Sequence, residues 1–82
     1  MTTNLITAVD YLAQIMRDPN ADPALRDQAA VALIDNPTAG GEAVAYLLAT
    51  MRDANADPER RDQAAIALIR HETALLELQN DE

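Results

Sequence analysis

The chain contains the same 27-residue segment twice, 35 residues apart. The first copy runs from Ala8 to Ile34 and the second from Ala43 to Ile69, and 19 of the 27 paired positions are identical. Duplication at a fixed period of about 20–50 residues is typical of stacked-repeat proteins, in which one unit covers the apolar face of its neighbour. The duplication therefore constrains the architecture strongly, but it names no reaction and no substrate.

Apolar residues recur at three- and four-residue spacing in each copy, which predicts two helices per copy. We expect an all-α fold in which the four helices form two stacked antiparallel hairpins. The last helix has no glycine or proline after the repeat and should continue to about Leu78. The predicted ranges are about Asn4–Arg17 with a cap at Thr2 or Thr3, Pro23 up to the turn at Asn36, Glu42–Arg52, and Pro58–Leu78.

Turn-forming residues separate the predicted helices and divide one domain of residues 1–82 into two units. Repeat 1 covers about 4–35, a linker covers 36–41, and repeat 2 covers about 42–79. The linker holds both glycines and is predicted to be the most flexible joint. Asp22 and Asp57 each precede a proline that suits the first helical position, so both are predicted helix N-caps.

The second half of each repeat resembles the B helix of a HEAT-type repeat. That family shows Arg, then small residues three and four positions later, then Ala-Leu, as in the segment from Leu25 to Leu33. The second copy departs at Arg60, where the family has an aliphatic residue. The resemblance implies that a turn aspartate and this arginine tie neighbouring repeats together. The residues that it places in this inter-repeat network are Asp18, Arg26, Asp53 and Arg61.

A narrower segment, from Tyr11 to Ala30, is similar to one found in phage proteins labelled terminase small subunits. The resemblance implies a phage-encoded accessory of DNA packaging or head assembly. Those proteins normally carry a basic helix-turn-helix, which this chain lacks. The resemblance therefore implies the helical assembly or regulatory part of such a protein.

The net charge of −8 comes from 14 acidic residues against 6 arginines, with no lysine. Binding to nucleic acid needs clustered basic residues, so this balance argues against direct contact with DNA or RNA and favours a basic partner. No apolar run is long enough to span a membrane, and the first residues lack the basic region of a secretory signal. We expect a cytoplasmic protein of a bacterial cell or of a phage.

The residue types give little basis for catalysis. The chain has no cysteine and no serine, and its single histidine, His71, is predicted to be a plain surface residue. The spacing of Asp18, Asn20 and Asp22 imitates the start of a calcium loop, but Pro23 stands where that loop needs glycine. We therefore expect no enzyme activity, no metal, no cofactor and no small-molecule substrate.

Several exposed positions are predicted to contact another protein. Leu75, Leu76 and Leu78 lie beyond the second repeat, where either the extended helix folds them onto the first or third helix or another chain covers them. Tyrosines are favoured at interfaces, and arginines recur with them at equivalent positions. The recurring arginines either form a partner-binding rim or join the two hairpins through aspartates such as Asp27 and Asp62. These repeated candidates are Tyr11, Tyr46, Arg17 and Arg52.

The sequence favours a non-enzymatic interaction or assembly module that binds itself, a larger protein, or both. The alternative is a small acidic inhibitor that covers a basic, nucleic-acid-binding surface of a host protein. In that alternative the working residues are Asp10, Asp18, Asp22, Asp27, Asp53, Asp57, Glu59 and Asp62.

Overall fold

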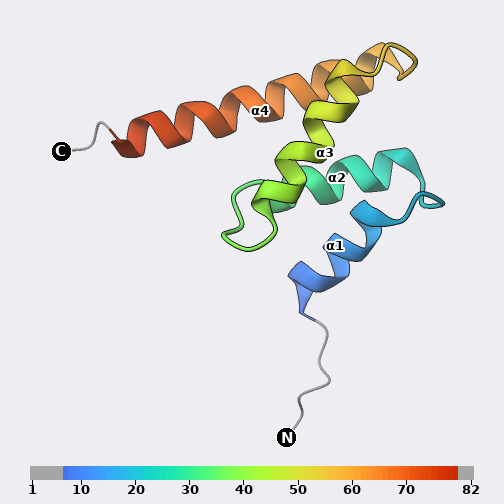
Figure 1. Ribbon diagram of the computed structural model, residues 1–82, viewed down its shortest axis with the longest axis horizontal. Helices are drawn as coiled ribbons and strands as arrows, with labels where there is room; N and C mark the ends of the chain where they lie inside the picture. Colours follow the sequence, from blue (N-terminus) through green and yellow to red (C-terminus); the bar gives the residue numbers. More distant parts are fainter. Residues whose placement is uncertain (1–6, 80–82) are drawn as a thin grey trace, which may run out of the picture.

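The computed structural model describes residues 7–79, and within this range it contains four helices and no strand (Figure 1). The prediction of an all-α chain with four helices is confirmed. We name α1 with α2 the first unit and α3 with α4 the second unit. The helices are α1 Ala8–Arg17, α2 Pro23–Leu33, α3 Gly40–Arg52 and α4 Pro58–Gln79.

The first helix begins later than predicted. Thr7 has extended backbone angles, and its side chain accepts a hydrogen bond from the backbone N–H of Asp10, so it is the N-cap of α1. A continuous helix from Asn4 to Arg17 is therefore wrong. The predicted caps Thr2 and Thr3 lie outside the described residues.

The turn inside each unit is built twice by the same hydrogen bonds. Asp18 Oδ1 accepts from the backbone N–H of Asn20 at 2.9 Å, and Asp53 does the same for Asn55. Asp22 then accepts from the backbone N–H of Ala24 at the start of α2. Asp57 accepts from Glu59 in the same way at the start of α4. A side-chain oxygen at this position satisfies a donor that the helix itself leaves unpaired.

The connection between the units, residues 34–39, begins and ends two residues earlier than the predicted linker, because α2 ends at Leu33 and Gly40 and Gly41 are the first residues of α3. Neither glycine has a positive φ. Asn36 orders the connection by accepting hydrogen bonds from the backbone N–H groups of Thr38 and Ala39. Gly40 is needed for close approach, since a Cβ atom there would lie 2.7 Å from the backbone oxygen of Ile34.

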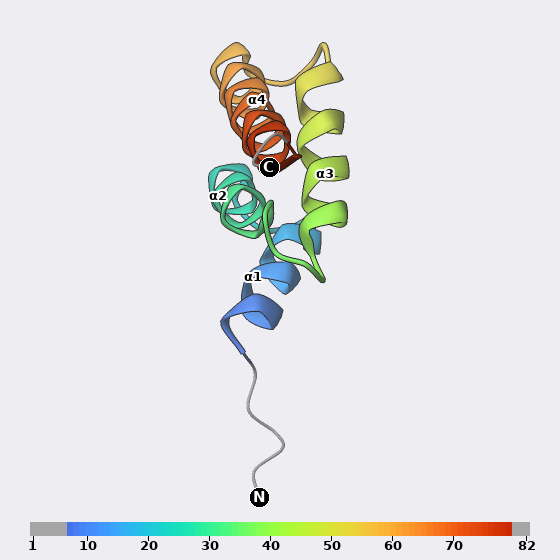
Figure 2. The same cartoon turned by 90° about the vertical axis from the view of Figure 1, so that its left-hand side faces the viewer.

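Within each unit the two helices pack on each other, and α2 also contacts both α3 and α4. Figure 2 shows α2 and α4 on one side of the molecule and α3 on the other. One core runs through both units, and seven of its twelve buried apolar residues are alanines, so the helices approach closely. The larger buried residues are Met16, Leu33, Ile34, Leu47 and Leu68.

Candidate functional site

The second half of α4 projects past the rest of the molecule. α4 has 22 residues whereas its repeat equivalent α2 has 11. Figure 1 shows the red end of α4 reaching beyond the connection between α2 and α3. The side chains of Leu75, Leu76 and Leu78 are 46%, 57% and 72% exposed. The alternative in which these leucines fold onto the first or third helix is therefore wrong. We name these three residues the leucine edge.

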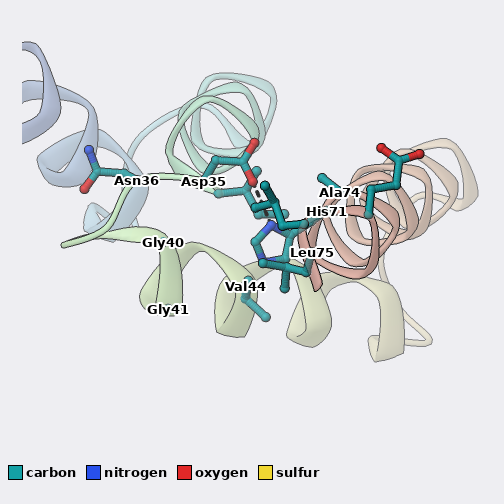
Figure 3. A pocket seen from close by; sticks show the side chains of 11 residues that line it. Asp35, Asn36, Gly40, Gly41, Val44, His71, Ala74 and Leu75 are labelled. Atoms are coloured by element: carbon teal, nitrogen blue, oxygen red, sulfur yellow. Dashed lines mark hydrogen bonds and ion pairs between the residues drawn. The ribbon is translucent and has the colours of Figure 1, made fainter. Parts of the chain in front are cut away.

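A groove of about 800 Å³ runs between the projecting half of α4 and the start of α3. Two members of the leucine edge, Leu75 and Leu78, line it from α4. Leu75 is labelled in Figure 3. Ile34 and Val44 line it from the other elements, and Gly41 leaves space at the first turn of α3. The groove is mainly apolar, with polar groups near the end of α2.

His71 and Asp35 meet at this groove, 2.7 Å apart between Nδ1 and Oδ1 (Figure 3). The carboxylate accepts, so Nδ1 carries the proton. The His71 side chain is only 18% exposed, and the prediction of a plain surface histidine is wrong. The contact ties α4 to the end of α2 across 36 residues of sequence, which no local pattern could have indicated.

A histidine oriented by a carboxylate is also the arrangement that a general base uses. Covalent catalysis would in addition need a nucleophile within hydrogen-bond reach. Among the described residues that line the groove, none carries a hydroxyl or a thiol. The other polar groups there are Asn36 and Glu77. The groove therefore offers an apolar surface and a rigid polar end, and its own side chains supply no nucleophile of that kind.

A polar cluster joins the two units at the first half of α2, away from the groove at its end. Asp27 of α2 accepts hydrogen bonds from Arg60 Nε at 2.7 Å and from the Tyr46 hydroxyl at 2.8 Å. The guanidinium of Arg26 lies over the Tyr46 ring, 5.0 Å from its centre. We name Arg26, Asp27, Tyr46 and Arg60 the inter-unit cluster. Three helices contribute to it, so it sets how the units lie on one another.

The pKa values in the inter-unit cluster follow from burial and from these hydrogen bonds. Burial raises the pKa of Asp27. The hydrogen bonds from Arg60 and Tyr46 and the nearby positive charges lower it by more than burial raises it, so the pKa of Asp27 lies below its usual value. Burial and the hydrogen bond to Asp27 raise the pKa of Tyr46. The hydrogen bond to Asp27 raises the pKa of Arg60. All three shifts stabilise the ionisation states that hold the cluster together near neutral pH.

A second contact between the units joins Arg17 to Glu42 through two hydrogen bonds of 2.7 Å. The hydrogen bond from Arg17 lowers the pKa of Glu42. Both side chains are largely exposed, at 58% and 44%, so solvent screens the pair. Arg17 and Asp27 thus join the units, but Arg17 does so through Glu42 and Asp27 through Arg60, so the predicted pairing among the recurring arginines and aspartates is not what the structure shows.

The network predicted from Asp18, Arg26, Asp53 and Arg61 is wrong in its pairing. Arg26 Nε donates to the backbone oxygen of Met16, and Arg61 Nε donates to that of Met51, both at 2.9 Å. Each arginine therefore satisfies a helix-end carbonyl within its own unit, and each aspartate serves its own turn. Only Arg26 also reaches the other unit, through the Tyr46 ring.

Two further candidates lie at the surface. Tyr11, the repeat equivalent of Tyr46, is 60% exposed, and Arg52, the equivalent of Arg17, is exposed. The residues that sequence reasoning missed are Asp35, Glu42 and Arg60. Arg60 did carry a signal, because it replaces the residue equivalent to Leu25 in an otherwise repeated segment.

The described residues contain no group of three or more potential metal ligands. In the same part of the chain, every helix is too short or too polar to cross a bilayer.

Comparison of the chain with protein-family models, with curated proteins and with solved structures gives no match in any of the three. The resemblances to HEAT-type repeats and to phage terminase small subunits therefore stay predictions.

Proposed function

We propose that this protein is a non-enzymatic protein–protein interaction module built from two HEAT-like helix pairs. Its partner is a second copy, a larger protein, or both. The observation that carries the proposal is the leucine edge, because three leucines on one projecting half-helix are 46% to 72% exposed. Large apolar side chains exposed together on one short segment are typical of an interaction site.

The groove beside the leucine edge supports the same proposal. Leu75 and Leu78 line one wall, and Val44 and Ile34 line the other. An amphipathic helix commonly binds by placing its apolar face in such a groove. The His71–Asp35 contact holds the polar end of the groove in place, so the partner meets a preformed surface.

The segment from Tyr11 to Ala30 supports a phage context, in which the protein serves DNA packaging or head assembly. The net charge of −8 favours action through protein contacts over direct contact with DNA. The genes beside this one test the phage context, and a gene for a large terminase or a portal protein among them would support it. A neighbourhood of unrelated metabolic genes contradicts it.

The experiment is site-specific photo-cross-linking inside the cell type that encodes the protein. A photoreactive residue at Leu76 is expected to cross-link to one defined protein, identified by mass spectrometry. The matched control is the same residue at Ala49, an exposed position on α3. The cross-link from Leu76 should disappear when Leu75→Asp and Leu78→Asp are added. Equal cross-linking from both positions, or none from either, contradicts the proposal.

The alternative proposal is a small acidic inhibitor of a nucleic-acid-binding protein. Asp57 and Glu59 lie at a second groove between α2 and α4, which favours it. Against it, Asp27 is paired with Arg60, and four of the other aspartates accept backbone hydrogen bonds at turns and helix starts. If the protein is an inhibitor, its affinity for a basic partner should fall steeply with added salt. Leu76→Asp should leave this binding unchanged.

A further inference from the structure

The contact between the two units supplies a template for contacts at the two ends of the molecule. On α2 and its C-cap, Asp27, Ala30 and Ile34 share one side by their three- and four-residue spacing. On this side Asp27 contacts Tyr46 and Arg60, and Ile34 lies against Gly40 of the second unit. Ala30 is fully buried and Ile34 is 7% exposed. The residues that repeat them on α4 are Asp62, Ala65 and Ile69. We name these three the back face.

The back face is uncovered at every one of these positions. Ile69 is 61% exposed where its equivalent Ile34 is buried, and Asp62 is exposed where Asp27 is half-buried. Ala65 is half-buried where Ala30 is fully covered. These three residues are identical in the two copies, so the difference in exposure comes from what packs against them within residues 7–79.

The opposite end shows the complementary change. In the second unit, Ala43, Tyr46, Leu47 and Thr50 share one side of α3 by their spacing, and Tyr46 on this side contacts Arg26 and Asp27 of the first unit. All but the half-buried Tyr46 are buried. Their equivalents on α1 are more exposed. We name these equivalents the front face: Ala8, Tyr11, Leu12 and Ile15.

We infer that the front face of one copy binds the back face of another, so that the chain associates head to tail. In this contact Tyr11 takes the place of Tyr46, with its hydroxyl donating to Asp62 and its ring against Arg61, the equivalent of Arg26. Ala8 and Leu12 cover Ala65 and Ile69. The inference rests on the proposed function and names a second copy as the partner and the two end faces as the site.

The contact between two copies should differ from the contact between the two units of one chain at two positions. Leu25 stands where Arg60 donates to Asp27, so the intermolecular contact lacks that ion pair. Thr7 stands where Glu42 pairs with Arg17. The association between copies should therefore be weaker than the packing of the two units. Its two faces differ, so it adds copies in one direction and does not stop by symmetry at a dimer.

The test is the mass of the wild-type protein by sedimentation velocity and light scattering over about 10–500 µM, the range in which weak interfaces assemble. The expected mass rises with concentration from the 8.9 kDa of one chain past that of a dimer. Tyr11→Asp removes the front face, and Ala65→Arg removes the back face. Each variant alone is expected to stay monomeric, with circular dichroism confirming the helices.

The decisive arm mixes the two variants. The Ala65→Arg chain keeps an intact front face and the Tyr11→Asp chain an intact back face, so the mixture is expected to form a dimer and nothing larger. Ile69→Asp replaces Ala65→Arg should that variant fail to fold. Gln14→Asp and Ala49→Arg change exposed residues away from both faces and should assemble like wild type. Leu25→Arg restores the missing donor and should tighten association by about two- to fivefold.

A wild-type protein that stays at 8.9 kDa throughout, or a mixture of variants that stays monomeric, overturns the inference. Assembly that is lost on Leu76→Asp but unaffected by Tyr11→Asp also overturns it and leaves the leucine edge as the interaction site. Assembly lost on Tyr11→Asp, together with an absence of cross-links at Leu76, supports the end faces and contradicts the leucine edge.

Discussion

Arg60 Nε donates to Asp27 Oδ2 over 2.7 Å, and this contact crosses from α4 of the second unit to α2 of the first. The Asp27 side chain is 18% exposed, so its charge is partly removed from water. The pair occurs at the point where the repeat is broken, because the residue equivalent to Arg60 is Leu25. The departure from repetition thus supplies the donor that a partly buried carboxylate needs.

Arg60→Leu should therefore lower the free energy of unfolding by about 1–2 kcal/mol, because a partly buried carboxylate loses its charged donor. The substitution places at position 60 the residue that the first repeat already has. Urea unfolding followed by circular dichroism measures the loss. Arg52→Leu is the matched control at an exposed arginine and should change the free energy by less than about 0.5 kcal/mol. Equal effects of the two substitutions contradict a structural role of the pair.

The stability should depend on acid pH through Asp27. Its pKa is lowered in the folded state, so the carboxylate contributes stability above its unfolded pKa of about 3.9. That contribution is lost as the pH falls through the lower folded pKa. Wild type should lose about 1 kcal/mol more than Asp27→Asn between pH 5 and about pH 2.5, measured as urea midpoints. Asp62→Asn changes the exposed equivalent of Asp27, and its stability should depend on pH as that of wild type does. If the stability of Asp27→Asn also shows the wild-type pH dependence, the prediction is contradicted.

The two glycines of α3 should respond to alanine in opposite directions. At Gly40 a Cβ atom would lie 2.7 Å from the Ile34 oxygen, so Gly40→Ala must move the α2–α3 connection and should cost about 1–3 kcal/mol. At Gly41 no atom lies within 4 Å and the backbone is helical, so Gly41→Ala should gain up to about 1 kcal/mol. Thermal unfolding compares them, and a shift of the same sign for both contradicts the close approach at Gly40.

The small core should be sensitive to cavities. Leu33 is 2% exposed, and Leu33→Ala should cost about 2–5 kcal/mol, which is comparable to the whole stability of a domain this small. The variant is expected to be largely unfolded at 25 °C, which circular dichroism would show as a helical signal close to that of the unfolded chain. Leu78→Ala removes the same atoms from a side chain that is 72% exposed and should keep wild-type stability. A cooperative wild-type-like transition for Leu33→Ala contradicts the position of the core.

The sequence by itself determined the local structure of this protein. The duplication and its apolar spacing predicted four helices, and the Asp-Pro steps predicted where α2 and α4 begin, because caps and prolines act within one turn of the chain. These features depend on neighbours only a few residues away.

Only the tertiary structure decided which residues join the units. The sequence suggested pairs between Asp18 and Arg26, yet those side chains serve their own turn and helix end. The contacts between units come instead from Asp27 with Arg60 and from His71 with Asp35, which are 33 and 36 residues apart. No periodic pattern links such positions, because their distance in space depends on how two helix pairs rotate against each other. Tyr11 and Ile69 are likewise exposed while their repeat equivalents Tyr46 and Ile34 are covered, because packing between the units differs where the residue type does not.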